Sequence, residues 1–173
     1  FTLLAFDMDG RLIDSLAAIV EASVEAFAGT PFETPTADQV REVVGLHLEL
    51  CVEHWAPQAS PDQVRDLAER YRMAFRGQRA RGEQNVTFYS GVSETLDLLR
   101  HDETFMAVVT GKDRRGLDAT LQMQGFGHHF HSLQTPDTNP GKPAPDMVWS
   151  ANRETATEAR DTVVIGDTSF DME

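Results

Sequence analysis

Two aspartates that follow the first apolar run of the chain have the spacing that points most directly to chemistry. Asp7 and Asp9 come after residues 2–5 (TLLA), a run that predicts a buried β-strand. Residues i and i+2 of a strand point to the same side, so we expect both carboxylates near one spot, and Gly10 then allows a sharp turn. Carboxylates this close repel each other unless a cation or a proton lies between them. An ordinary Asp-Gly turn at a strand end would give the same residues, so the rest of the chain has to decide between the two interpretations.

Polar residues also follow two later apolar runs. The runs 105–110 (FMAVVT) and 162–165 (TVVI) predict strands, and a turn-rich loop with four prolines spans 136–145. In an open parallel sheet, sites form where the carboxyl ends of the strands meet. The residues that we expect there, beside Asp7 and Asp9, are Thr110, Gly111, Lys142, Asp167 and Asp171.

The elements that must position these residues form two groups along the chain. From residue 83 on, predicted strands alternate with predicted helices, which indicates a parallel sheet with right-handed crossovers. Residues 16–82 read as helix throughout, with capping boxes at Thr36 and Ser60. We therefore predict an α/β fold: a Rossmann-like parallel sheet core built from residues 1–15 and 83–173, with an all-helical cap domain inserted at 16–82.

Composition limits the classes of function. The chain has 173 residues, a formal net charge of −13 and a pI near 4.8, which makes nucleic acid or an anionic membrane an unfavourable partner. No apolar run approaches the roughly 20 residues of a membrane span, and no signal peptide is evident at Phe1. Cys51 is the only cysteine, so an internal disulfide is impossible. These features together favour a cytoplasmic protein.

Four motifs occur in chain order, each at a strand end or in the loop before one: Asp7 with Asp9, Thr110 with Gly111, Lys142, and Asp167 with Asp171. Together they resemble the haloacid dehalogenase superfamily of aspartate-nucleophile phosphatases. The resemblance covers nearly the whole chain, and it is greatest for the phosphoglycolate phosphatase branch, which carries a helical cap after the first motif. It implies that Asp7 attacks phosphorus to form an aspartyl-phosphate. It also implies that Asp9 protonates the leaving alcohol and later activates water.

The same resemblance implies roles for the remaining residues. Thr110 and the backbone N–H groups around Gly111 would hold the phosphoryl oxygens, and Lys142 would offset the charge of phosphate and nucleophile. Mg²⁺ is the implied cofactor, because a hard cation suits oxygen ligands beside a phosphate. Its implied ligands are the Asp7 side chain, the Asp9 backbone carbonyl and Asp167, with Asp171 orienting them.

Single residues favour one branch of the superfamily over the others. Asp9 disfavours the dehalogenases, which look similar but have no acid there. Ile19 stands where the β-phosphoglucomutase branch carries a histidine, and the segment 47–49 (HLE) lacks the cap lysine of the phosphonatases. We therefore expect a monoesterase for a small phosphorylated substrate such as phosphoglycolate, acting as a monomer or homodimer.

Two departures keep alternatives open. Arg11 replaces the usual threonine or valine, and the chain ends at Glu173, soon after the last predicted strand. They keep open a catalytically weak or inactive binding protein with the same fold. A β-phosphoglucomutase-like phosphomutase is a further alternative within the superfamily. Other conspicuous residues are interpreted as ordinary structure. We expect a solvated loop at His128, His129 and His131, and a solvent-exposed helix face at Arg65, Arg72, Arg76 and Arg79. Trp55 and Trp149 are expected to be packing residues.

Overall fold

The computed structural model describes residues 2–100 and 104–172. The chain divides into two compact units. One comprises Phe1–Asp14, Gly45–His47 and Thr87–Glu173, and the other comprises Ser15–Val44 and Leu48–Val86.

A parallel four-stranded sheet organises the first unit. Its strands are β1 (Leu3–Phe6), β4 (Phe105–Val109), β5 (Ser132–Gln134) and β6 (Thr162–Ile165), in the order β5-β4-β1-β6. All three strand pairs are parallel, and Phe6 at the end of β1 lies in register with Val108 on one side and Ile165 on the other. The predicted α/β fold with a parallel sheet is therefore confirmed, and the strands that carry the motifs are neighbours.

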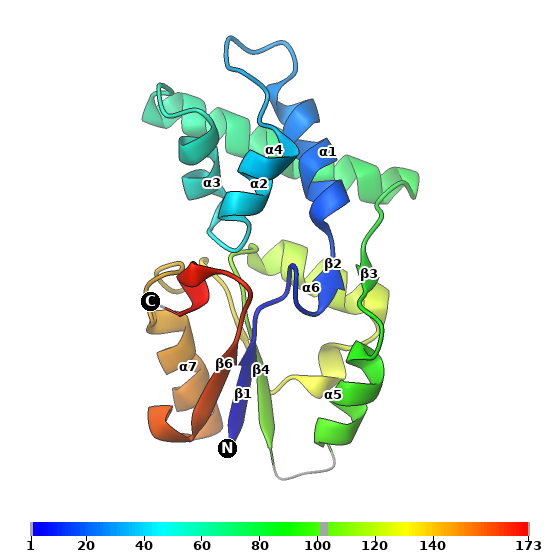
Figure 1. Ribbon diagram of the computed structural model, residues 1–173, viewed down its shortest axis with the longest axis vertical. Helices are drawn as coiled ribbons and strands as arrows, with labels where there is room; N and C mark the ends of the chain where they lie inside the picture. The colour runs from blue at the N-terminus through cyan, green and yellow to red at the C-terminus, as the bar shows by residue number, and fades with distance from the viewer. Residues whose placement is uncertain (1, 101–103, 173) are drawn as a thin grey trace. The chain divides into compact units, whose positions relative to one another are not determined.

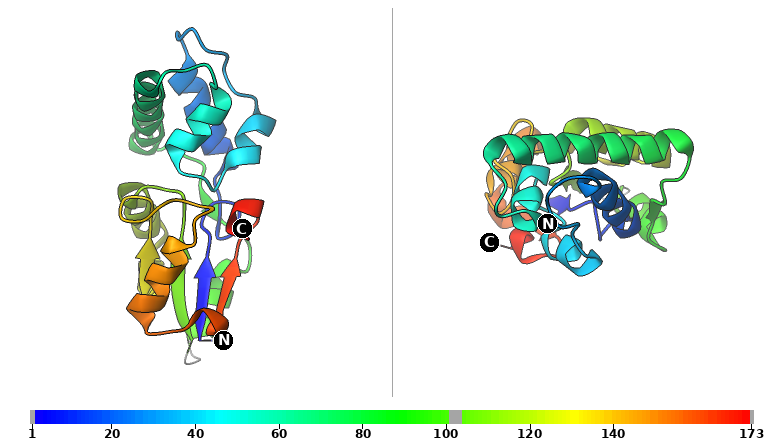
Figure 2. Two further views of the ribbon diagram at one scale, coloured as in Figure 1. Left: turned by 90° about the vertical axis from the view of Figure 1, so that its left-hand side faces the viewer. Right: turned by 90° about the horizontal axis from the view of Figure 1, so that it is seen from above.

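Helices cover both faces of this sheet. Helix α7 (Asp146–Thr155) packs on one face, where Met147 joins Ala5 and Val109, and Ala151 joins Leu3 and Ala107, in fully buried contacts. Helices α5 (Val92–Arg100) and α6 (Arg114–Gln124) lie on the opposite face (Figures 1 and 2). Three short 3₁₀ turns complete the unit: Gly127–His129, Ala159–Asp161 and Ser169–Asp171.

A second, very small sheet lies in the same unit. Strand β2 (Ile13–Asp14) pairs antiparallel with β3 (Thr87–Phe88), with Ile13 opposite Phe88 and Asp14 opposite Thr87. A two-residue strand has no periodicity to recognise, so the sequence gives no signal for this pair. The pairing joins the two places where the chain passes between the units.

The second unit is entirely helical among its described elements. It contains α1 (Leu16–Phe27), α2 (Ala37–Val43), α3 (Leu48–Trp55) and α4 (Pro61–Arg81). The predicted capping boxes at Thr36 and Ser60 are both formed, and Pro61 opens α4. Trp55 packs edge-on against Phe27 and beside Tyr71, so it is a core residue, as expected.

The division into units differs from the predicted domains in three places. Residues 45–47 belong to the α/β unit and not to the helical one, whereas Ser15 and residues 83–86 belong to the helical unit. Within the described residues, no helix is long and apolar enough to cross a membrane.

Two expectations about individual side chains are wrong. His129 is buried, stacks on Phe126 and lies with its Nε2 2.8 Å from Asp97 Oδ1, so it belongs to the core and not to a solvated loop. Trp149 is 51% exposed, so it is not a packing residue like Trp55. Of the arginines on α4, Arg65 is 69% exposed, as a solvent-exposed helix face requires. Arg72 is only 24% exposed and pairs with Glu49 of α3 at 2.7 Å.

Candidate active site

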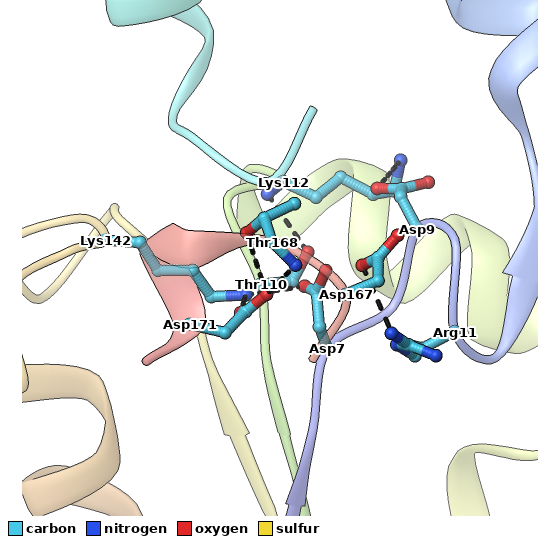
Figure 3. A network of polar contacts seen from close by, with 9 residues as sticks. All are labelled: Asp7, Asp9, Arg11, Thr110, Lys112, Lys142, Asp167, Thr168 and Asp171. Atoms are coloured by element: carbon cyan, nitrogen blue, oxygen red, sulfur yellow. Dashed lines mark hydrogen bonds and ion pairs between the residues drawn. The ribbon is translucent and has the colours of Figure 1, made fainter. Parts of the chain in front are cut away.

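The carboxyl ends of β1, β4 and β6 bring the predicted site residues to one edge of the sheet (Figure 3). Because Phe6 and Ile165 are register partners, the residues that follow them leave the sheet side by side, and the Asp7 N–H donates a 2.9 Å hydrogen bond to the Ile165 carbonyl. Asp7, Asp167 and Asp171 each place one carboxylate oxygen within 4.8 Å of the others. Residues 160 positions apart in the sequence thus form one acidic cluster.

Asp7 lies at the bottom of this cluster and is 2% exposed. Its Oδ1 is 2.7 Å from the Lys142 ammonium, which is equally buried. Burial, only partly offset by the Lys142 charge, raises the pKa of Asp7 from 3.8 to about 7. Apart from the Lys142 ion pair, both Asp7 oxygens lack a hydrogen-bond partner among the described residues. Lys142 is therefore the one described partner that favours the ionised carboxylate, and its effect does not outweigh burial.

Asp171 is held in place by residues on both sides of its carboxylate. Its Oδ1 is 2.5 Å from Lys142 Nζ, and its Oδ2 accepts hydrogen bonds from the Thr168 hydroxyl at 2.8 Å and the Thr168 N–H at 3.1 Å. Burial raises the pKa of Asp171, but the Lys142 charge and the Thr168 hydrogen bonds outweigh it and lower the pKa below 3.8. Lys142 therefore bridges two carboxylates, one of which is firmly ionised.

Asp167 occupies the outer side of the cluster. It packs on Gly10, whose φ of +81° is a left-handed conformation and whose missing Cβ leaves the room that the Asp167 Oδ2 fills. Burial and the neighbouring Asp171 raise the pKa of Asp167 in spite of Arg11. Arg11 Nε lies 3.9 Å from Asp167 Oδ1, with 41% of the arginine side chain exposed. Arg11 thus reaches the edge of the acidic cluster from the solvent side.

Thr110 and Gly111 follow β4 at the same edge. Thr110 is 1% exposed, and its hydroxyl oxygen accepts a 3.2 Å hydrogen bond from the Lys112 N–H. A Cβ on Gly111 would collide with the carbonyl oxygens of Gly45 and Leu46, so this position requires glycine. The predicted phosphate-binding turn therefore lies beside the acidic cluster, with the segment 45–47 packed on it.

Asp9 is the one predicted acidic residue whose side chain does not join the cluster. The strand ends at Phe6, and the chain is already turning at Asp9, so the expected alternation of the strand no longer applies. Its Oδ2 lies instead 3.0 Å from the Nζ of Lys112, a residue to which the sequence analysis assigned no role (Figure 3). A lone lysine after a strand gives no sequence signal for such a pair.

The cluster has the composition of a site for a hard divalent cation. Its donors are carboxylate oxygens, the ligands that Mg²⁺ prefers, and the buried Asp7 and Asp171 each have an oxygen without a hydrogen-bond partner among the described residues. A cation beside them would offset the burial that raises the pKa of Asp7. The residues present therefore fit Mg²⁺, with Asp7, Asp167 and Asp171 as the side chains that would hold it.

Comparison with known proteins gives the site a family context. Residues 4–173 match the sequence profile of the haloacid dehalogenase-like hydrolases. Among curated proteins, the chain is 31% identical to "Probable phosphatase IndB" of Dickeya dadantii, over 98% of this chain and 74% of that protein. It is 28% identical to a phosphoglycolate phosphatase of Vibrio parahaemolyticus, over 98% and 77% of the two chains.

Solved structures share the fold. A haloacid dehalogenase-like family protein from Streptococcus pneumoniae superposes with a TM-score of 0.80 at 25% identity, over 99% of this chain and 78% of the other. A protein from Bacteroides vulgatus that is described as a β-phosphoglucomutase superposes with a TM-score of 0.81 at 18% identity, over 99% and 70%. The latter likeness is one of fold alone.

Proposed function

Because this chain belongs to the haloacid dehalogenase-like hydrolases, we propose that it is a Mg²⁺-dependent phosphatase that hydrolyses a small phosphate monoester through an aspartyl-phosphate. The observation that carries the proposal is the buried group of Asp7, Lys142 and Asp171, in which a lysine bridges two carboxylates at 2.7 and 2.5 Å. Such a group combines a nucleophile with fixed charge, which is what phosphoryl transfer requires.

In the proposed first step, an Asp7 oxygen forms a bond to phosphorus while the bond from phosphorus to the ester oxygen breaks. Asp9 gives its proton to the departing oxygen, and in the second step it takes a proton from the water that attacks the aspartyl-phosphate. Thr110 and the N–H groups of its turn bind the phosphoryl oxygens, and Lys142 stabilises their charge. When bound, Mg²⁺ supplies positive charge to the phosphoryl group and to the carboxylates that hold it.

We propose a small substrate with phosphoglycolate as the first candidate. The support is the set of curated relatives named phosphoglycolate phosphatases, of which the Vibrio parahaemolyticus protein is one. The helical unit is proposed to act as a cap that excludes water from the reacting phosphate, with no nucleic acid or membrane as partner. A cytoplasmic location and a monomeric or homodimeric state remain predictions from the sequence.

The mutase alternative is less favoured because of one residue. Ile19 is an apolar, buried side chain of α1, at the position where the resemblance places the histidine of the β-phosphoglucomutase branch. A buried isoleucine cannot transfer a proton. The binding-protein alternative is tested together with the main proposal.

The experiment is a phosphatase assay on p-nitrophenyl phosphate followed by a panel of phosphorylated metabolites, with Mg²⁺ and with EDTA. Turnover with Mg²⁺ that EDTA abolishes is expected, and Asp7→Asn is expected to remove it, because an amide is not a nucleophile here. Asp118→Asn is the matched control, since Asp118 is an exposed acid of α6 that pairs only with a surface arginine in the described contacts, Arg114. A wild-type chain without activity on any of these esters would support the binding protein instead.

A further inference from the structure

The chain has only two lysines, and both lie at the active-site edge of the sheet. Lys142 is engaged by the acidic cluster. Lys112 lies on the turn after β4, with its Nζ 3.0 Å from Asp9 Oδ2. Side-chain exposures of 13% for Lys112 and 11% for Asp9 mean that this ion pair is largely shielded from water. A pair this far from solvent is held far more firmly than a surface salt bridge.

The stem of Lys112 is supported along its length. The Lys112 N–H donates to the Thr110 hydroxyl, which fixes the start of the side chain at the phosphate-binding turn. Its Cγ and Cδ lie 3.2 and 3.5 Å from where a Cβ on Gly116 would be, so they run against the bare backbone at the start of α6. Figure 3 shows the side chain extended from this turn toward Asp9. The ammonium is therefore aimed at Asp9 by packing as well as by charge.

The Asp9 side chain lies apart from the acidic cluster. Asp7, two residues earlier, shares that cluster with Asp167 and Asp171, whereas the Asp9 side chain is absent from it. A hard cation draws in carboxylate oxygens within reach, and ligation would prevent Asp9 from exchanging a proton. The turn of the backbone after Phe6 directs Asp9 away from the cluster, and Lys112 is the cation that meets its carboxylate there.

We propose that Lys112 is a positioning residue that keeps the Asp9 carboxylate out of the metal cluster and so reserves it for proton transfer. The inference rests on the proposed function. In each turnover Asp9 gives one proton to the ester oxygen, which leaves with the electron pair of its bond to phosphorus. It regains one proton from the attacking water as the bond from phosphorus to Asp7 breaks and its electron pair returns to Asp7. Lys112 forms no covalent bond in either step.

The first test measures metal binding without substrate, in a cycle of Lys112→Met and Asp9→Asn made in the full chain. Removal of Lys112 is expected to tighten Mn²⁺ binding by about fivefold, roughly the effect of one further unit charge at contact distance in a water-like medium. In the Asp9→Asn background the same removal is expected to change Mn²⁺ affinity little, because the entering carboxylate is gone. An equal gain in both backgrounds would show a plain loss of positive charge and overturn the proposal, as would no gain at all.

The second test separates the two chemical steps. Nitrophenolate can leave without being protonated, whereas an alkoxide needs a proton from Asp9 to leave. For p-nitrophenyl phosphate, misplacing Asp9 should therefore slow only the second step, the hydrolysis of the aspartyl-phosphate. Lys112→Met is therefore expected to show a burst of nitrophenol equal to the enzyme concentration. On an alkyl phosphate it should show no burst and a loss in kcat of about 100-fold, the order expected for a misplaced catalytic group. An equal loss of kcat on both substrates, without a burst of nitrophenol, would indicate a merely structural role for Lys112 and overturn the proposal.

Two further variants complete the design. Lys112→Arg keeps a cation on the turn and is expected to restore part of the lost kcat, which guards against a methionine variant that folds poorly. Arg115→Met removes an exposed cation from the first turn of α6. It is expected to bind Mn²⁺ and to release nitrophenol as the wild type does. If the wild-type chain hydrolyses no phosphate ester, the proposed function fails, but the binding cycle still decides where Asp9 goes.

Discussion

Asp7→Asn should stabilise the metal-free protein at neutral and alkaline pH. Asp7 is 2% exposed, and burial raises its pKa to about 7 in spite of Lys142. The unfolded chain ionises this carboxyl near its ordinary pKa of 3.8. Above that value the folded protein must either hold a proton that the unfolded chain releases or bury a charge. An asparagine has neither requirement and keeps nearly the same volume.

The size of the effect follows from the two pKa values of Asp7. A folded pKa raised above the unfolded one gives a contribution to stability that is fully present below about pH 4 and is lost as the pH rises through about 7. The difference of 3.8 to about 7 corresponds to about 4 kcal/mol at 1.36 kcal/mol per pKa unit, and this is an upper limit. We therefore expect the advantage of Asp7→Asn to grow between pH 5 and pH 8.

The assay is urea unfolding of both proteins in EDTA at pH 5 and at pH 8. Comparing the variant with the wild type at each pH cancels the titration of the histidines, which both proteins share. Addition of Mg²⁺ should restore the wild type more than the variant, because a ligand that binds the folded state stabilises it. If the two proteins kept the same difference in free energy of unfolding at both pH values, the argument from Asp7 burial would be refuted.

Three further predictions address other parts of the site. Arg11→Thr should lower the Mg²⁺ concentration for half activity by up to about fivefold, since a partly exposed ion pair at 3.9 Å is worth at most about 1 kcal/mol. If the variant needed clearly more Mg²⁺ than the wild type, Arg11 would be a working part of the site. Gly10→Ala should destabilise the fold by about 1 kcal/mol or more and weaken Mn²⁺ binding, because the left-handed φ of Gly10 and the Asp167 carboxylate leave no room for a Cβ. An unchanged midpoint of urea unfolding together with an unchanged Mn²⁺ affinity would contradict this. Incubation with β-glucose 1-phosphate should give free phosphate or no reaction; glucose 6-phosphate as the main product would establish a mutase.

The sequence alone predicted the main sheet and the residues gathered at its edge. Apolar runs that end in Asp7, Thr110 and Gly166 are long enough to be recognised as buried strands, and parallel strands must end on the same side. Asp171 was among the residues predicted there, and it pairs with Thr168 in a capping box while it faces Lys142. Motif order and strand physics were sufficient for these features.

Features that depend on distant partners could not be predicted. His129 is buried because Asp97, 32 residues earlier, accepts its hydrogen bond, and nothing near either residue signals the pair. Asp9 turns toward Lys112 because the strand ends before it, and strand ends are poorly defined in a sequence. Residues 45–47 group with the α/β unit through contacts with Gly111 and Gly141, which only the folded chain brings near.

The β2–β3 pair makes the helical unit an interchangeable module. Asp14 and Thr87 are opposite each other in a two-stranded antiparallel pair, and everything between Ser15 and Val86, apart from the segment 45–47, belongs to the helical unit. In topological terms, that unit occupies the place of the loop in a β-hairpin, since a turn of two residues could join the same pair of strands. Loop length costs little once the ends are fixed, so recombination at this neck could exchange one insert for another. The acidic cluster and both lysines would stay encoded outside the exchanged segment, so the proposed chemistry would be kept whichever insert the neck carried.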